Sequence, residues 1–205
     1  MVTDLVTGSG RSQPKGDKRD RTRAKLLEAA RSLIREKGYE HTTLENIAEK
    51  AGMTTGAIYG NFKNREELFI SLGLAYWAPI KPQVKPGASF SEIMLAMAEA
   101  TIAAIPDRSS AAVGRLTGLA YTLTHEELRT RVREITAQSY AFGEQWLLEM
   151  TKEEDLPMPA GQMVRVIHAL TEGLVFQRLL TPELVPDEVF RAAFGALAIR
   201  PSKAS

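Results

Sequence analysis

The chain has 205 residues, of which 44% are hydrophobic and 7% aromatic, so it is long enough to bury a good-sized apolar core. It contains no cysteine, which excludes disulfides, thiolate metal sites and cysteine nucleophiles and suits a reducing compartment. The N-terminal segment lacks an apolar core of signal-peptide length, and no run approaches the ~18 apolar residues of a membrane span. We therefore expect a soluble, cytoplasmic protein with no membrane partner.

The net charge of +1 hides an uneven distribution of charge along the chain. Residues 1–65 hold 13 Lys and Arg against 8 Asp and Glu, whereas residues 66–205 hold 13 against 17. A basic end on an otherwise acidic protein indicates a polyanion or an anionic membrane as partner, although a solvated, disordered arm has the same composition. The basic side chains are densest in one stretch, which contains Arg11, Lys15, Lys18, Arg19, Arg21, Arg23 and Lys25.

Apolar residues recur at helical spacing along nearly the whole chain, and neither a strand pattern nor an internal repeat stands out. Asp20 is a candidate cap for the first helix and Gly38 its stop, while Asn64 with Glu67 opens the fourth and Pro106 ends the fifth. The sequence predicts an all-α fold of about nine helices, near residues 20–37, 43–51, 54–61, 64–78, 89–105, 109–121, 128–146, 163–180 and 187–199.

Charge and helix pattern together divide the chain into three parts. Residues 1–20 are expected to form a flexible basic arm and residues 21–65 a small helical domain. Residues 66–200 are expected to form a larger helical body behind them.

The second and third predicted helices are short and are separated by a sharp turn. Gly52 can adopt the left-handed conformation that ends one helix, and Thr54 can cap the next. Ala48 is small where the two helices would cross, which gives helix-turn-helix geometry, although an ordinary helical hairpin in a core has the same pattern.

The segment TTGAIYGNFK makes a poor core helix, because Thr55, Gly56, Tyr59 and Asn61 form a small, partly polar surface with little bulk. Such a face suits a recognition helix in the DNA major groove. Glycine and alanine let the backbone approach the groove, while hydroxyls and amides reach phosphates and base edges. Lys63, the last residue of this segment, adds a positive charge.

The run TTLENIAEKAGMTTGAIYGNFKNREELF, preceded by LLEAARSLIREKGYE, is similar to the N-terminal domain of the TetR family of bacterial transcriptional regulators. The resemblance covers about residues 23–69 without a gap, and HALTEGLVFQRLL further along resembles the penultimate, dimer-forming helix of the family. It implies a repressor that binds a double-stranded, palindromic DNA operator as a homodimer and is released by a small molecule. Residues 21–65 would then bind DNA, and residues 66–200 would bind the effector and dimerise.

The resemblance also implies roles for single residues of the helix-turn-helix. Gly60 stands where the family often has a bulkier polar or aromatic residue, so Thr55, Tyr59 and Asn61 are the expected base readers. The basic arm from Arg11 to Lys25 would lie along the DNA backbone or enter the minor groove. The implied phosphate contacts are Thr43, Thr54, Tyr59 and Lys63, and the residues implied to face the major groove are Thr55, Gly56, Ala57, Gly60 and Asn61.

The last two predicted helices carry more apolar residues than the core of one monomer obviously needs. In the family they form a four-helix bundle with their mates, although both could simply complete the monomer core. The dimer interface expected from this pattern comprises Ile167, Leu170, Leu174, Phe190, Phe194 and Leu197.

The fifth to eighth helices are where the family keeps its small-molecule pocket. Aromatic and methionine side chains there are candidate lining, although each fits equally well in a plain core. The lining looks apolar with few charges, so the expected effector is hydrophobic or aromatic. The candidates are Tyr76, Trp77, Phe90, Met94, Met97, Tyr121, Phe142, Trp146 and His168.

Catalysis and an adaptor role are the competing interpretations. The three histidines lie far apart without metal-ligand spacing, and the chain has no nucleophile elbow, phosphate-binding glycine loop or HExxH motif. We therefore expect no enzyme activity, no metal and no cofactor. A helical adaptor whose basic arm binds acidic lipid or protein predicts binding that is insensitive to Tyr59 and Lys63.

Overall fold

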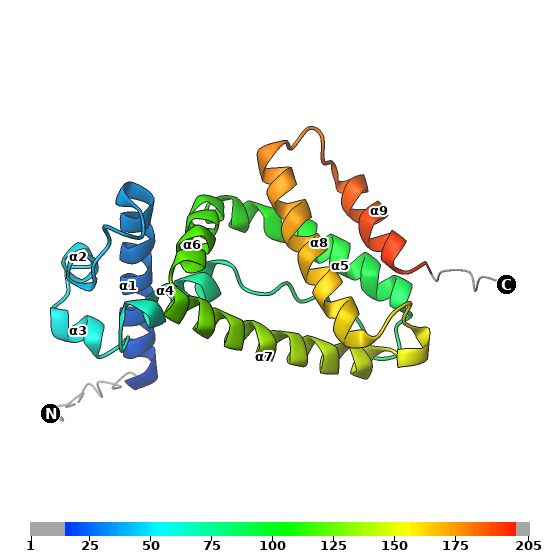
Figure 1. Cartoon of the computed structure of the whole chain (residues 1–205), viewed down its shortest axis with the longest axis horizontal. Helices are drawn as coiled ribbons and strands as arrows, with labels where there is room; N and C mark the ends of the chain where they lie inside the picture. The colour runs from blue at the N-terminus through cyan, green and yellow to red at the C-terminus, as the bar shows by residue number, and fades with distance from the viewer. Residues whose placement is uncertain (1–14, 200–205) are drawn as a thin grey trace, which may run out of the picture. The chain divides into compact units, whose positions relative to one another are not determined.

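The computed structural model describes residues 15–199, and within them it contains nine α-helices, one 3-10 helix and no strand (Figure 1). The predicted all-α class is confirmed. The residues divide between Leu72 and Gly73 into two compact units. The helices are α1 (Lys15–Lys37), α2 (Leu44–Lys50), α3 (Thr55–Tyr59), α4 (Arg65–Tyr76), α5 (Phe90–Ser109), α6 (Ala112–Thr124), α7 (Glu126–Met150), η1 (Glu153–Asp155), α8 (Ala160–Leu180) and α9 (Asp187–Leu197).

Helix α1 begins at Lys15 rather than near Asp20, so Asp20 is an exposed residue within the helix and not its cap. The intervening lysines and arginines are good helix formers and let the helix extend into the basic stretch. The hydroxyl of Thr22 donates to the Lys18 carbonyl (3.0 Å), one helical turn earlier. The expected flexible arm is therefore helical from Lys15 onward, and Arg11 lies outside the described residues.

The first unit packs α1, α2 and α3 around one small core. Apolar residues of α1 recur every three or four positions, which places them on one face. Leu26 and Ala30 of that face are fully buried, as are Ile47 of α2 and Ile58 of α3. Phe62, the residue before the turn into α4, is 1% exposed and closes this core.

The second unit is built around α5, with α9 packed along it and α8 against both (Figure 1). Ser89 begins α5 with a capping box, in which its hydroxyl accepts from the Glu92 N–H (3.3 Å) and the Glu92 carboxylate accepts from the Ser89 N–H (2.8 Å). Helix α7 packs mainly against α8. The fully buried side chains of this core include Ile93, Met94, Met163, Phe190 and Phe194.

Pro106 lies inside α5 and does not end the helix as predicted. A proline removes one backbone donor, and near the end of a helix this loss is readily offset. The following residues are held by Arg108, whose guanidinium donates to the Ala78 carbonyl (2.8 Å) and forms an ion pair with Glu172 (3.5 Å). These contacts keep the last turn of α5 helical.

Within the described residues no helix combines the length and the apolar composition needed to cross a bilayer.

Candidate nucleic-acid interface and a buried polar network

The turn between α2 and α3 has the geometry that the glycine predicted. Gly52 has φ +65°, in the left-handed region that favours glycine. The N–H of Met53 donates to the Ala48 carbonyl (2.9 Å) and that of Gly52 to the Glu49 carbonyl (2.9 Å). This is the Schellman pair of hydrogen bonds that closes a helix C-terminus, so the start of α3 is held firmly against the end of α2.

Threonine hydroxyls cap both short helices. Thr43 accepts from the Asn46 N–H (3.2 Å) at the start of α2, and Thr54 accepts from the Ala57 N–H (3.3 Å) at the start of α3. Each hydroxyl accepts these bonds through a lone pair, so its own proton is available for another partner. Both side chains are exposed at the surface of the first unit.

Glu45 lies beside two of the predicted phosphate contacts. Tyr59 is 52% exposed, and its hydroxyl donates to the Glu45 carboxylate (3.3 Å). The pKa of the Glu45 carboxyl is lowered by its own backbone N–H, then by the Thr43 hydroxyl and by Tyr59. An ionised carboxylate therefore holds both hydroxyls in the protein without DNA.

The remaining predicted groove residues occupy an open surface of α3 and the turn after it. Thr55, Gly56 and Gly60 are exposed, and Ala57 is half-buried. Gly60 has an ordinary helical φ of −72°, and a Cβ there would come 3.3 Å from the Gly56 carbonyl oxygen. Lys63 is exposed, and its backbone N–H donates to the Glu67 carboxylate (2.8 Å).

Asn61 points inward in this structure. Its amide nitrogen donates to the Ala57 carbonyl (2.8 Å), and its side-chain oxygen is buried without a hydrogen-bond partner. The Asn61 backbone carbonyl accepts from Arg23 of α1 (2.7 Å). A role for Asn61 in reading bases stays a prediction, and in this conformation the side chain binds the end of α3 instead.

Arg23 belongs to the framework of the first unit and not to a free arm. Its guanidinium also donates to the Ser71 hydroxyl of α4 (2.5 Å) and lies 4.2 Å from the centre of the Phe62 ring. Sequence reasoning grouped it with the basic stretch because its neighbours are charged. The contact with an aromatic face is the physical reason for its inward position.

The residues expected at a dimer interface lie in the core of the second unit. Phe190 and Phe194 are 0% exposed, so neither has surface left for a partner, and that part of the expectation is wrong. The other four are half-buried and pack against the same core. Helix α9 packs along α5, and its two phenylalanines are buried in the core of the protomer. The four are Ile167, Leu170, Leu174 and Leu197.

A different set of apolar and small residues remains exposed on α8, α9 and the residues after α9. These side chains recur at three- to four-residue spacing on the solvent face of each helix. We call this set the α8–α9 outer face, and it comprises Ala169, Gly173, Leu180, Val189, Ala192, Ala196 and Ile199.

The predicted pocket residues do not form one group. Met94 is fully buried in the core, and Phe142 is 63% exposed, so it lines no interior of the protomer. Tyr121 stacks on His125, with ring centres 3.7 Å apart. Phe90 and Met97 belong to the same core, and the half-buried Trp146 packs against it. Trp77 is buried outside this core, and Tyr76 is half-buried.

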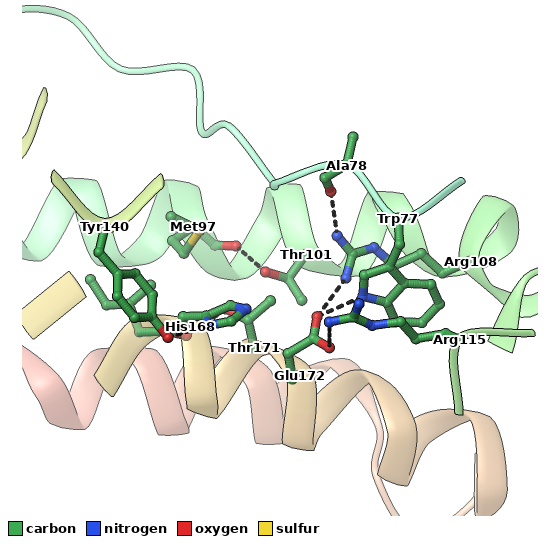
Figure 2. A network of polar contacts seen from close by, with 11 residues as sticks. Trp77, Ala78, Met97, Thr101, Arg108, Arg115, Tyr140, His168, Thr171 and Glu172 are labelled. Carbon is green, nitrogen blue, oxygen red and sulfur yellow. Dashed lines mark hydrogen bonds and ion pairs between the residues drawn. The ribbon is translucent and has the colours of Figure 1, made fainter. Parts of the chain in front are cut away.

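Trp77 instead belongs to a network of charged side chains, which Figure 2 shows, in which Arg108 is buried and Arg115 and Glu172 are half-buried. Its indole N–H donates to the Glu172 carboxylate of α8 (2.6 Å), which also accepts from Arg115 of α6 (3.2 Å) and Arg108 of α5 (3.5 Å). Burial lowers the pKa of the Arg108 guanidinium, and the Glu172 carboxylate opposes that shift. Trp77, predicted from the sequence as part of an apolar lining, therefore contacts charged side chains.

A second polar pair lies further along α8 from this network (Figure 2). The hydroxyl of Tyr140 on α7 lies 2.8 Å from Nδ1 of His168. Burial lowers the pKa of His168, with Glu172 raising it and Arg115 lowering it further. The lowered pKa favours the neutral imidazole, and His168 as a whole is exposed.

Sequence reasoning missed Arg108, Arg115, Glu172 and Tyr140. One signal was present, because Glu172 is the only acidic residue in the largely apolar segment 160–180 and follows His168 by one helical turn. The arginines come from other helices, which spacing alone does not bring together. Among the described residues, no cluster of His, Asp or Glu side chains could hold a metal ion.

Comparison with known proteins identifies the first unit. A family model described as "Bacterial regulatory proteins, tetR family" matches residues 26–72, which include α2 and α3. Over 51 residues the chain is 49% identical to "HTH-type transcriptional regulator TtgR" of Pseudomonas putida. That match covers 25% of this chain and 24% of that protein, and the chain spans about a quarter of the curated relatives it matches.

Solved structures extend the likeness to the whole fold. NalD, the secondary repressor of the MexAB-OprM multidrug efflux pump in Pseudomonas aeruginosa, has a TM-score of 0.58 at 24% identity, over 91% of this chain and 100% of that one. A SmeT–triclosan complex has a TM-score of 0.57 at 20% identity, over 87% and 90%. TtgR is described as a transcriptional regulator and NalD as a repressor.

The helix-turn-helix with its glycine turn lies within the matched region, and the all-α fold extends the likeness through the second unit. Residues 26–72 therefore carry the sequence match to the tetR family of bacterial regulatory proteins, and the remaining described residues share the all-α fold of the solved relatives.

Proposed function

We propose that the protein is a cytoplasmic repressor that binds a palindromic DNA operator as a homodimer and is released by a small-molecule effector. The observation that carries the proposal is the exposed surface of α3, held by the Gly52 turn and flanked by cap hydroxyls. Small residues there permit close approach to the groove, and Tyr59 stands clear of the core.

The charge of the first part of the chain supports a polyanionic partner. Residues 1–65 carry an excess of Lys and Arg, and several of these residues lie on α1. Phosphate contacts from Lys63, Thr43 and Thr54 would set the position of α3, and Thr55 and Tyr59 would read bases. Such contacts make binding strongly dependent on salt.

Two copies of the chain are part of the proposal, because one recognition helix covers few base pairs. The surface that we assign to the second copy is the α8–α9 outer face. Gly173, Ala192 and Ala196 have little side chain, so helices from two protomers can approach closely there. Leu180 and Ile199, which are 68% and 72% exposed, would gain burial from the same contact.

The second unit is the proposed effector-binding part. Its structural neighbours include a SmeT complex with triclosan. Because the folds are alike, we expect this chain to bind a small, largely apolar ligand as well. The residues that we expect to meet it are those between α5, α7 and α8 that keep accessible edges, chiefly Trp146 and His168.

Selection of bound duplexes from a randomised DNA pool tests the proposal. The purified protein is run at near-physiological salt beside a double variant, Tyr59→Ala with Lys63→Ala, and beside a control, Lys81→Ala. Lys81 is exposed and lies outside the first unit. Its loss removes one positive charge, as the loss of Lys63 does, but leaves α3 unchanged.

Recovery of one palindromic motif by the protein and the control, but not by the double variant, is the expected result. Failure of all three proteins to enrich any sequence would reject the DNA-binding proposal. In that case a helical adaptor that uses its basic surface to bind acidic lipid or protein would become the preferred function.

A further inference from the structure

The buried network around Glu172 has an excess of positive charge. Two guanidinium groups, from Arg108 and Arg115, face one carboxylate, and burial lowers the pKa of His168 nearby. Arg108 is 5% exposed, so bulk water solvates little of its charge. A buried charge without a full counter-charge is costly, and an anion supplied from outside would lower that cost.

The hydrogen bonds of the network are also incomplete. Nε of Arg115 is buried and has no hydrogen-bond partner. The Glu172 carboxylate has its short contact with the Trp77 indole (2.6 Å), whereas its contact with Arg108 is 3.5 Å long. Arg108 also donates to the Ala78 carbonyl (2.8 Å), but the remaining guanidinium N–H groups outnumber the acceptor atoms that Glu172 can offer them at good distance.

Apolar groups lie directly beside these donors. Trp77 stacks on Phe176 of α8 with ring centres 5.3 Å apart, and the Arg108 guanidinium lies 4.6 Å from the Trp77 ring centre. The two buried hydroxyls nearby donate within their own helices, Thr101 to the Met97 carbonyl and Thr171 to the Ile167 carbonyl (Figure 2). They leave no free donor, so the arginines are the polar groups available to a ligand.

The region is reachable from outside. The side chain of Arg115 is 27% exposed and that of Glu172 is 19% exposed, and His168, one helical turn before Glu172 on α8, is exposed. A small molecule can thus approach the guanidinium groups without unfolding the unit.

We infer that the effector of this regulator is an organic acid, whose carboxylate binds Arg115 and Arg108 in competition with Glu172 and whose apolar part lies against the adjoining aromatic groups. The inference rests on the proposed function for its regulatory meaning, but the binding itself needs no DNA. It adds a negative charge to the hydrophobic or aromatic effector expected from the sequence.

Equilibrium dialysis of the purified full-length protein tests this inference. The probes are 4-phenylbutanoate and naphthalene-2-carboxylate, each with its primary amide and with an amine of the same skeleton. The proteins are the unmodified chain, Arg115→Met, Glu172→Gln and a control, Arg131→Met, which removes an exposed arginine of α7. Duplex binding is measured separately in the absence and presence of each probe.

The unmodified chain and the control should bind at least one carboxylate about tenfold more tightly than its amide or amine, as a charge-assisted pair requires. Arg115→Met should remove this preference. Glu172→Gln should strengthen carboxylate binding, because the competing carboxylate is gone. That variant also guards against misfolding, since a gain of affinity cannot come from a damaged protein.

Equal binding of acid and amide, preference for the amine, or no binding of either acid would overturn the inference. A carboxylate preference that Glu172→Gln weakens would overturn it as well, because the acid would then bind elsewhere. Selective binding of acids by a protein that enriches no DNA would reject the regulator and keep the ligand site. Sequence-specific DNA binding without acid selectivity would do the reverse.

Discussion

Arg23 of α1 and Asn61, which follows the recognition helix α3, are joined by a 2.7 Å hydrogen bond from the guanidinium to the backbone carbonyl. The same guanidinium reaches Ser71 of α4 and the face of Phe62. One half-buried side chain thus connects the three helices of the first unit that have to hold α3 in place. Arg23 contributes mainly by holding α3 in position, and the attraction between its charge and DNA is secondary.

Replacing Arg23 with Met should lower the free energy of unfolding by about 1–3 kcal/mol, because two hydrogen bonds from a charged donor are lost. Thermal unfolding followed by circular dichroism measures the change. Arg19→Met removes the same charge from an exposed site on the same helix and should leave stability within ~0.5 kcal/mol. Equal stability of the two variants would show that the Arg23 contacts carry no weight.

Removing the charge of Glu45 should strengthen binding to DNA of any sequence. Its carboxylate holds the hydroxyls of Tyr59 and Thr43, and it stands where phosphates are proposed to lie. The exchange Glu45→Gln should raise affinity about 2- to 5-fold, the effect of one exposed charge contact. Fluorescence anisotropy with two unrelated duplexes at low salt measures it. Glu49→Gln, at the other end of α2, is the matched control, and a larger gain for that variant would refute the assignment.

The turn before α3 shows what a sequence can predict about this fold. Gly52, the cap at Thr54 and the spacing of α1 are local signals, and each has the predicted structure. The start of α1 was misplaced because charged helix formers carry no apolar period that would mark where a helix begins. The Glu172 network was missed for another reason, since its members come from separate helices and meet only through tertiary packing.

Because Gly52 has a left-handed backbone conformation and Gly73 lies inside a helix, alanine should change the unfolding free energy in opposite directions at the two positions. Alanine at Gly52 meets no atom within 4 Å but forces a φ of +65°, which should cost about 1–2 kcal/mol of unfolding free energy. Alanine at Gly73, inside α4 with similar free space, should instead stabilise the protein by about 0.5–1 kcal/mol. Urea denaturation of both variants gives the comparison, and destabilisation by both would contradict it.

Apolar residues of α9 could not be sorted from the sequence into those facing the core and those facing a partner. Both faces recur at helical spacing, and the periodicity of one helix contains no information on what covers it. The structure buries Phe194 against α5 and leaves Ala192 exposed. Within α9 the two phenylalanines fill the core of the protomer, whereas Ala192 and Ala196 remain on the outer face, where two backbones can come close.

This division predicts opposite effects for two changes in α9. Ala192→Asp places a charge on the α8–α9 outer face and should shift the dimer toward monomer, while the unfolding free energy of the protomer changes by less than ~0.5 kcal/mol. Phe194→Ala removes a fully buried ring and should cost about 3–5 kcal/mol of stability. Sedimentation velocity across a concentration series reports association, and chemical denaturation of monomeric samples reports stability. If Ala192→Asp sediments like the unmodified chain, the dimer surface lies elsewhere, and the assignment of the α8–α9 outer face to the second copy is refuted.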